Sequence, residues 1–130
     1  MIEKLTLSTY LAQANAVIDT IAVHDAVNLW SDPDVLFIDV RETAEIQKSG
    51  SIPGALHVPR GFLEFIADPA GPMHKKEIAC GKMIIVYCGT GGRSVLAAKT
   101  LADMDIAHVN NLAGGIKAWS EAGGPVEQSE

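Results

Sequence analysis

The chain has 130 residues and a formal net charge of −6, with 48% apolar and 20% charged residues. This length suits a single domain with one hydrophobic core, and no run of 18 apolar residues is present that could span a membrane. The negative charge, with lysine and arginine scattered along the chain, opposes binding to nucleic acid or to an anionic membrane surface. Polar residues interrupt the first apolar stretch, which makes a poor signal peptide, so we expect a cytoplasmic protein.

Short apolar runs alternate with helical patterns along the chain. In chain order the patterns predict helix 8–18, helix 24–30, strand 35–39, helix 43–48, strand 55–58, helix 61–67, strand 83–87, helix 94–104, strand 107–110 and helix 115–122. The first helix belongs to an extension, residues 1–19, which could serve as a packing arm or as the contact of a homodimer. The other elements form a domain of residues 20–126. Their alternation indicates an α/β fold with a mostly parallel sheet.

Residues 83–87 form the clearest strand, because this run is short, partly β-branched and without helical spacing of polar residues. A glycine-rich loop, residues 88–93, joins it to the helix predicted over 94–104. In open parallel sheets, ligands bind beyond the carboxyl ends of the strands. The segment 39–41 follows another predicted strand, so we expect this segment and the loop to meet at one edge of the sheet.

The loop consists of Cys88, Gly89, Thr90, Gly91, Gly92 and Arg93. It leads into a helix N-terminus, where unpaired N–H groups and the positive end of the helix dipole favour an anion. Its glycines allow backbone angles that turn successive N–H groups toward one centre. Such surroundings lower the pKa of a cysteine thiol, so Cys88 is predicted to be a thiolate nucleophile. Arg93 adds a permanent cation that suits oxyanions.

A plainer interpretation makes Cys88 a small buried apolar residue beside an ordinary turn. The coincidence of strand, glycine loop, arginine and helix favours a working nucleophile. The other cysteine, Cys80, is predicted to lie at the amino end of the same strand, too far away for a disulfide. The spacing of the two cysteines matches neither a redox pair nor a zinc site, and the four histidines are dispersed. We therefore expect no metal.

Four segments of the chain, taken in order, resemble single-domain rhodaneses, a family of sulfurtransferases. They are Asp39-Val40-Arg41-Glu42, Gly50-Ser51-Ile52-Pro53-Gly54-Ala55, Tyr87-Cys88 through Arg93-Ser94, and Gly114-Gly115-Ile116 with Trp119. The resemblance covers roughly residues 20–125. It implies a five-stranded parallel sheet flanked by helices. It also implies sulfur transfer through a persulfide on Cys88, without a cofactor.

The resemblance also implies substrates and site residues. A small-molecule donor such as thiosulfate, or a persulfide-carrying protein, gives its sulfur to Cys88, and a thiol or cyanide accepts it. Cys88 and Arg93 are the expected catalytic residues. The residues expected to bind the anionic substrate are Gly89, Thr90, Gly91, Gly92, Arg41 and Arg60.

Two other functions remain open at this point. Related phosphatases and arsenate reductases resemble the loop, but they place five residues between cysteine and arginine, whereas four separate Cys88 from Arg93. The shorter loop encloses a smaller space, which suits a single sulfur atom better than a tetrahedral phosphate. The second alternative is a catalytically weak rhodanese module that binds a partner or regulates it, which the presence of Cys88 opposes. Many relatives carry a lysine or an aromatic residue where this chain has Gly92, so we expect low affinity for thiosulfate.

The two further arginines have structural alternatives. Arg41 could form an ion pair with Asp39, Glu42 or Glu45 instead of binding an oxyanion. Asp39 is expected to brace the loop, because a nucleophile that is already ionised needs no strong general base. Arg60 follows a predicted strand and resembles a basic residue at the site entrance in one subset of relatives.

Overall fold

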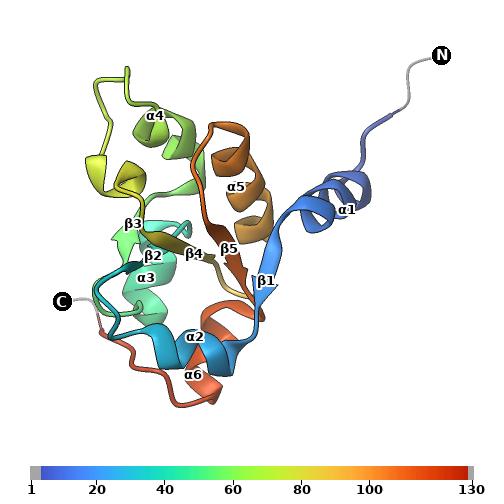
Figure 1. The fold of residues 1–130 in the computed structure, drawn as a ribbon. Coiled ribbons are helices and arrows are strands. Elements are labelled where there is room, and N and C mark those ends of the chain that lie inside the picture. The colour runs from blue at the N-terminus through green and yellow to red at the C-terminus, as the bar shows by residue number, and fades with distance from the viewer. Residues whose placement is uncertain (1–3, 129–130) are drawn as a thin grey trace.

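The apolar runs of the sequence form the centre of a parallel sheet (Figure 1). Its strands are β1 (Asp19–Ile21), β2 (Val35–Asp39), β3 (Leu56–His57), β4 (Met83–Tyr87) and β5 (Val109–Leu112), in the spatial order β1-β5-β4-β2-β3. All four strand pairings are parallel. This computed structural model describes residues 4–128. It confirms the expected α/β fold with five parallel strands.

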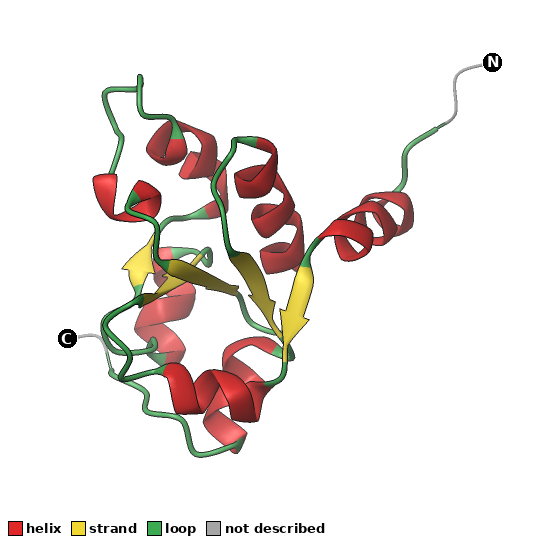
Figure 2. Ribbon diagram, viewed as in Figure 1, coloured by secondary structure: helices red, strands yellow, loops and turns green. Residues whose placement is uncertain are grey.

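Helices cover both faces of this sheet (Figure 2). They are α1 (Leu7–Val17), α2 (Val23–Leu29), α3 (Thr43–Ser49), α4 (Leu63–Ala67), α5 (Gly92–Asp103) and α6 (Gly115–Glu121), with short 3-10 helices at Arg60–Phe62 and Lys76–Ala79. None of the helices within residues 4–128 is long and apolar enough to cross a membrane.

Each face of the sheet buries its own hydrophobic core. Alternate residues of a strand point to opposite faces, so Ile84 and Val86 join one core and Ile85 and Tyr87 the other. The first core lies under α1, α4 and α5, and the second under α2 and α6. Trp119 of α6 is fully buried in the second core. The central strand β4 is thus held from both sides, which fixes the position of the loop that follows it.

Several element boundaries differ from those predicted. Strand β1 was not predicted, because its three residues are mostly exposed at the sheet edge and form no apolar run. The last strand begins at Val109 rather than at 107, since His108 has a φ of 59° and turns the chain just before it. The helix predicted over 61–67 is divided into a 3-10 turn and α4. The 3-10 helix Lys76–Ala79 was also missed.

The N-terminal helix α1 is present and leans away from the rest of the fold at one end (Figure 1). The Thr6 side chain caps it by accepting a hydrogen bond from the backbone N–H of Thr9. Ala14 is fully buried against α5, whereas Leu7 and Val17 are 66% and 64% exposed. Residues 1–3 of the predicted extension lie outside the described residues.

Candidate active site

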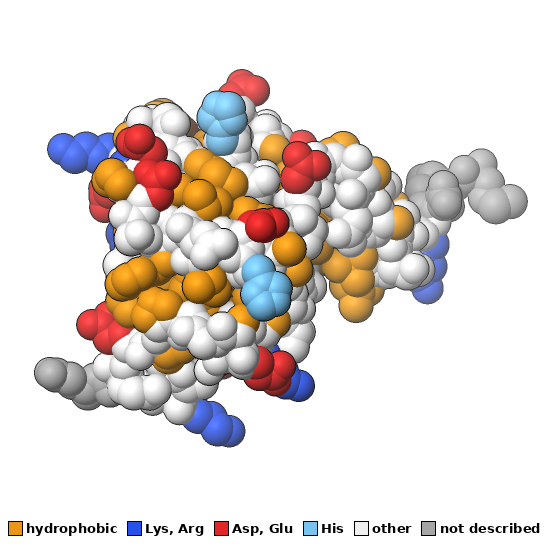
Figure 3. Space-filling model, turned by 60° about the horizontal axis from the view of Figure 1, so that its bottom comes forward, with side chains coloured by type: hydrophobic (Ala, Val, Ile, Leu, Met, Phe, Trp, Pro, Cys, Tyr) orange, Lys and Arg blue, Asp and Glu red, His pale blue; other side chains and the backbone are white. Residues whose placement is uncertain are grey.

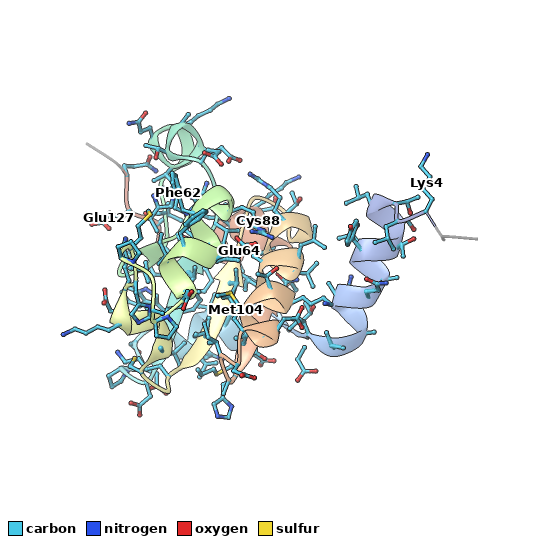
Figure 4. All side chains as sticks on the ribbon, turned by 90° about the horizontal axis from the view of Figure 1, so that it is seen from above. Lys4, Phe62, Glu64, Cys88, Met104 and Glu127 are labelled. Atoms are coloured by element: carbon cyan, nitrogen blue, oxygen red, sulfur yellow. The ribbon has the colours of Figure 1, made fainter. Side chains whose placement is uncertain are left out.

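Cys88 lies directly after β4, at the carboxyl end of the central strand. Seen from above, it sits within the body of the fold, far from Lys4 near the start of α1 (Figure 4). The residue is only 1% exposed. Its Sγ accepts hydrogen bonds from the Gly91 N–H at 3.1 Å and the Ser94 hydroxyl at 3.4 Å. The loop therefore wraps around the sulfur, as the sequence predicts.

These surroundings lower the pKa of the Cys88 thiol. Burial of the sulfur raises the pKa, but hydrogen bonds from the Ser94 hydroxyl and from the N–H groups of Ser94, Gly91 and Thr90 outweigh it. Gly91 has a φ of 112°, which a residue with a side chain rarely adopts, and this turn begins α5. The loop thus has the shape and polarity to hold a negative charge on sulfur.

The start of α6 fixes the loop from the other side. The N–H of Ile116 donates to the Cys88 carbonyl at 2.9 Å, and that of Lys117 donates to the Gly89 carbonyl at 3.2 Å. Gly115, with a φ of 62°, permits this approach, because a Cβ there would lie 2.6 Å or less from both carbonyl oxygens. Gly115 belongs to one of the four segments that resemble rhodaneses, but the sequence alone assigned it no role. The structure shows that it allows α6 to contact the loop backbone.

Ser94 and Asn111 complete the surroundings of Cys88, and neither was predicted as a site residue. Both are buried, and the Ser94 hydroxyl donates to the Asn111 Oδ1 at 2.6 Å, so that its single proton is shared between Asn111 and the Cys88 Sγ. Asn111 belongs to β5, whose sequence position gives no sign of this contact. The available signal was a small hydroxyl residue directly after Arg93, in the first turn of a helix that faces the thiol.

We expect Ser94→Ala to raise the pKa of the Cys88 thiol, so that its alkylation by iodoacetamide requires a higher pH. A hydrogen bond to a charged acceptor contributes about 1.5 kcal/mol, and the thiolate form would lose this donor. The rate of alkylation, followed against pH, should show its midpoint at higher pH. Ser94→Thr, which keeps the hydroxyl, is the matched control. An unchanged midpoint in Ser94→Ala would show that the hydroxyl does not stabilise the thiolate.

Arg93 extends from the loop and is paired with Glu45 of α3. Its two terminal nitrogens donate to the two carboxylate oxygens, both at 2.8 Å. Arg93 lowers the pKa of Glu45 to about 2, helped by the Glu42 N–H, so this carboxylate stays ionised. Glu45 in turn raises the pKa of Arg93. The guanidinium lies near the loop, since a Cβ on Gly89 would be 3.4 Å from it.

Arg41 forms the ion pair with Asp39, one of the two roles open for it from the sequence. Both side chains are 1% exposed, and the Arg41 Nη2 lies 2.7 Å from the Asp39 Oδ2. The remaining Arg41 donors reach the Ser49 hydroxyl at 2.9 Å and the Gly50 carbonyl at 2.6 Å. Arg41 thus ties the end of β2 to the end of α3. In this arrangement its hydrogen bonds go to the protein, at the wall of the site.

The structure does not bring Arg60 to Cys88. Its guanidinium pairs with Glu64 at 2.9 Å and contacts the Thr100 hydroxyl at 3.4 Å, in the middle of α5. It lines a separate hollow with Tyr10 of α1. Cys80 lies before β4, as predicted, and is exposed, whereas Cys88 follows that strand and is buried. Within residues 4–128, no cluster of side chains has the composition of a metal site.

A pocket of about 680 Å³ opens beside the loop. Gly89 and Thr90 line it on the loop side, and α3 and α6 supply the flanking walls. The side chains that line these walls are those of Arg41, Glu45, Lys48, Ser49, Ile116, Lys117, Ser120 and Glu121. The face on the side of α2 and α6 mixes apolar, acidic and basic side chains, without a continuous basic surface (Figure 3). A small or medium-sized ligand can therefore reach the loop.

Comparison with known proteins finds relatives over most of the chain. Residues 22–122 match the model of the rhodanese-like domain. A sulfurtransferase from Allochromatium vinosum is 36% identical over 97 residues, which cover 75% of this chain and 82% of the relative. Two further curated relatives are longer proteins, of which the chain spans 44% and 62%.

Solved structures show the same fold. A protein of unknown function from Rhodopseudomonas palustris, described as a possible tyrosine phosphatase, is 40% identical with a TM-score of 0.91, covering 98% of this chain and 99% of its own. A rhodanese-related protein from Thermoplasma volcanium is 25% identical with a TM-score of 0.68, covering 85% of this chain and 99% of its own. The matched family and the sulfurtransferase relative agree with the four segments that resemble rhodaneses. The chain therefore belongs to the rhodanese-like family.

Proposed function

We propose that this protein is a sulfurtransferase that carries a sulfane sulfur as a persulfide on Cys88. The observation that supports this most strongly is the hydrogen-bonded surroundings of the Cys88 Sγ, in a loop whose Gly89 and Thr90 line an open pocket. A thiolate held by N–H groups needs no separate base before it attacks. The same N–H groups can receive the negative charge of a persulfide, since they are already oriented toward the sulfur.

The reaction has two steps with thiosulfate as the donor. The Cys88 thiolate attacks the outer sulfur, the S–S bond of thiosulfate breaks, and sulfite leaves with the electron pair. Cyanide or a thiol then attacks the terminal sulfur of the persulfide and restores the Cys88 thiolate. Each step moves one neutral sulfur atom, so no cofactor is required. A reducing compartment such as the cytoplasm suits this chemistry, because it keeps Cys88 free between turnovers.

The phosphatase alternative has one relative in its favour, the Rhodopseudomonas palustris protein described above. The loop argues against it, because only four residues lie between Cys88 and Arg93. A module that only binds partners is disfavoured by the lowered pKa of the Cys88 thiol.

We expect the purified protein to form thiocyanate from cyanide when a sulfane sulfur donor is supplied. The assay should be run with thiosulfate and with an organic persulfide, because the two donors differ in size and charge. The same preparation should leave p-nitrophenyl phosphate unhydrolysed. Phosphate release without any thiocyanate, from a protein whose Cys88 is shown to be reduced, would contradict the proposal and support the phosphatase.

A further inference from the structure

Asn111 is a buried polar residue on an otherwise apolar face of β5. Its side chain is only 4% exposed. In the register of the sheet it pairs with Val86, so it shares the face on which Val86 and Val109 pack into the core under α5. A buried amide on such a face costs free energy unless it is hydrogen-bonded. Its hydrogen-bond partner is the hydroxyl of Ser94, in the first turn of α5.

The Ser94 hydroxyl has one proton and two acceptors. The Asn111 Oδ1 lies at 2.6 Å from the Ser94 Oγ, and the Cys88 Sγ lies at 3.4 Å. An amide oxygen is a good acceptor, whereas the sulfur of a neutral thiol is a weak one. The difference between the two distances follows the same order. The proton therefore points to Asn111 as long as Cys88 is a thiol.

Ionisation of Cys88 reverses this preference. A thiolate is a charged acceptor, and hydrogen bonds to charged acceptors are stronger than those to neutral ones. When the hydroxyl turns to the Sγ, the Asn111 Oδ1 stays buried and loses its donor, which costs free energy. The thiolate thus gains less stabilisation from Ser94 than the hydroxyl would supply if Asn111 did not compete for it.

A persulfide moves the negative charge away from the Sγ. In the reaction with thiosulfate, the thiolate forms an S–S bond and sulfite leaves with the electron pair. The charge then resides on the terminal sulfur, one S–S bond of about 2 Å further out. The Sγ itself is neutral again, so the Ser94 hydroxyl can return to Asn111. The buried amide oxygen therefore has its donor in the persulfide state and lacks it in the thiolate state.

We infer that Asn111 is a positioning residue for sulfur transfer: its Oδ1 competes with the Cys88 Sγ for the Ser94 proton, and so favours the persulfide over the free thiolate. The inference rests on the proposed sulfurtransferase activity. It assigns a part in that activity to a residue that acts only through Ser94.

Charged groups on the surrounding elements do not take part in this competition. Glu45 of α3 has a pKa of about 2 and is held by Arg93, and Asp39 of β2 is held by Arg41. Burial raises the pKa of the Tyr87 hydroxyl, which stays protonated. The other titratable side chains of α3, β3, α5 and α6 are exposed or half-buried: Lys48, His57, Lys99, Asp103, Lys117 and Glu121. All these groups are the same in the variants compared below.

The test measures how alkylation of Cys88 by iodoacetamide depends on pH, in a Cys80→Ser parent in which Cys88 is the only cysteine. Asn111→Leu replaces the amide by an apolar side chain of similar size. Its midpoint should lie about one pH unit below that of the parent, because ionisation no longer deprives a buried acceptor of its donor. On the high-pH plateau it should react about threefold more slowly, since the nucleophilicity of a thiolate falls with its pKa. A loop that had only loosened would react faster there.

Three further variants show whether the effect passes through the Ser94 hydroxyl. In Ser94→Ala the hydroxyl is absent, so adding Asn111→Leu should not move the midpoint any further. Asn111→Asp keeps an acceptor and adds a negative charge, so it should raise the midpoint, and a fall would contradict the inference. Asn110→Leu removes the neighbouring amide, which donates to the Ile84 and His108 carbonyls from the opposite face of β5. It should keep the midpoint of the parent.

The equilibrium between loaded and free Cys88 tests the consequence for sulfur transfer. The proteins are held at one ratio of thiosulfate to sulfite, at a pH where Cys88 is ionised in both, and the persulfide is read by intact mass. Asn111→Leu should hold about tenfold less persulfide relative to free thiolate than the parent, as a shift of one pH unit requires. An unchanged partition, an unchanged or raised midpoint, or a lowering that persists without the Ser94 hydroxyl would overturn the inference. If the parent gained no sulfur at all, the sulfurtransferase proposal would fail, and the midpoints alone would decide whether Asn111 competes for the proton.

Discussion

Replacement of Cys88 by serine is expected to abolish sulfur transfer, with a loss of roughly a thousandfold or more. Serine has nearly the same size and can accept the same hydrogen bonds, so the loop should keep its shape. Its hydroxyl is far less acidic than a thiol and has no sulfur with which to form a persulfide. Thiocyanate formation by the variant should fall to the rate of the uncatalysed reaction, while its thermal unfolding stays close to that of the wild type.

Cys80→Ser is the matched control for this experiment. Cys80 is exposed, and its Sγ donates a hydrogen bond to the Glu77 carbonyl, before the amino end of β4 and so at the opposite end of that strand from the loop. This variant should transfer sulfur at the wild-type rate. If Cys80→Ser lost activity and Cys88→Ser retained it, the nucleophile would be Cys80 and the account of the loop would be wrong.

The second large effect is expected from Arg41→Ala, and it concerns stability. Removal of the guanidinium leaves the Asp39 carboxylate buried at 1% exposure without its partner. Breaking a buried ion pair in this way costs about 3–5 kcal/mol. The variant also loses the hydrogen bonds to Ser49 and Gly50 that hold the end of α3. Urea denaturation should therefore show a large fall in the free energy of unfolding.

Arg60→Ala provides the comparison for Arg41→Ala. Arg60 also forms an ion pair, with Glu64, but both side chains are substantially exposed at 36% and 51%. Exposed pairs contribute less than about 1 kcal/mol, so this variant should unfold almost as the wild type does. Equal stability losses in the two variants would mean that the buried pair is not a structural support. Arg41 would then be available for the substrate-binding role considered from the sequence.

Local patterns predicted the features that depend on neighbouring residues. The alternation of short apolar runs and helical patterns predicted the α/β fold, and the glycine-rich loop predicted N–H donors around the Cys88 sulfur. Both follow from residues close together in the chain. Strand β1 escaped prediction because its pairing with β5, and not its own composition, makes it a strand.

The features of the site that could not be predicted depend on contacts between segments that are far apart in the sequence. Glu45 and Arg93 are 48 positions apart, so the sequence alone did not single out Glu45 as the partner of Arg93. Asn111 reaches Ser94 across 17 positions, from a polar stretch of β5. The resemblance to one subset of relatives predicted Arg60 at the site entrance, but in the structure its side chain contacts Thr100, in the middle of α5. In each case tertiary packing, rather than local pattern, sets the charge and hydrogen bonding of the site.

The most direct test of the central claim is the intact mass of the protein after incubation with a sulfane sulfur donor, measured without reductant. We expect an increase of one sulfur atom, located on the peptide that contains Cys88, reversed by cyanide with release of thiocyanate. Wild-type protein that carries a reduced Cys88 and gains no sulfur from thiosulfate or from an organic persulfide would contradict the account.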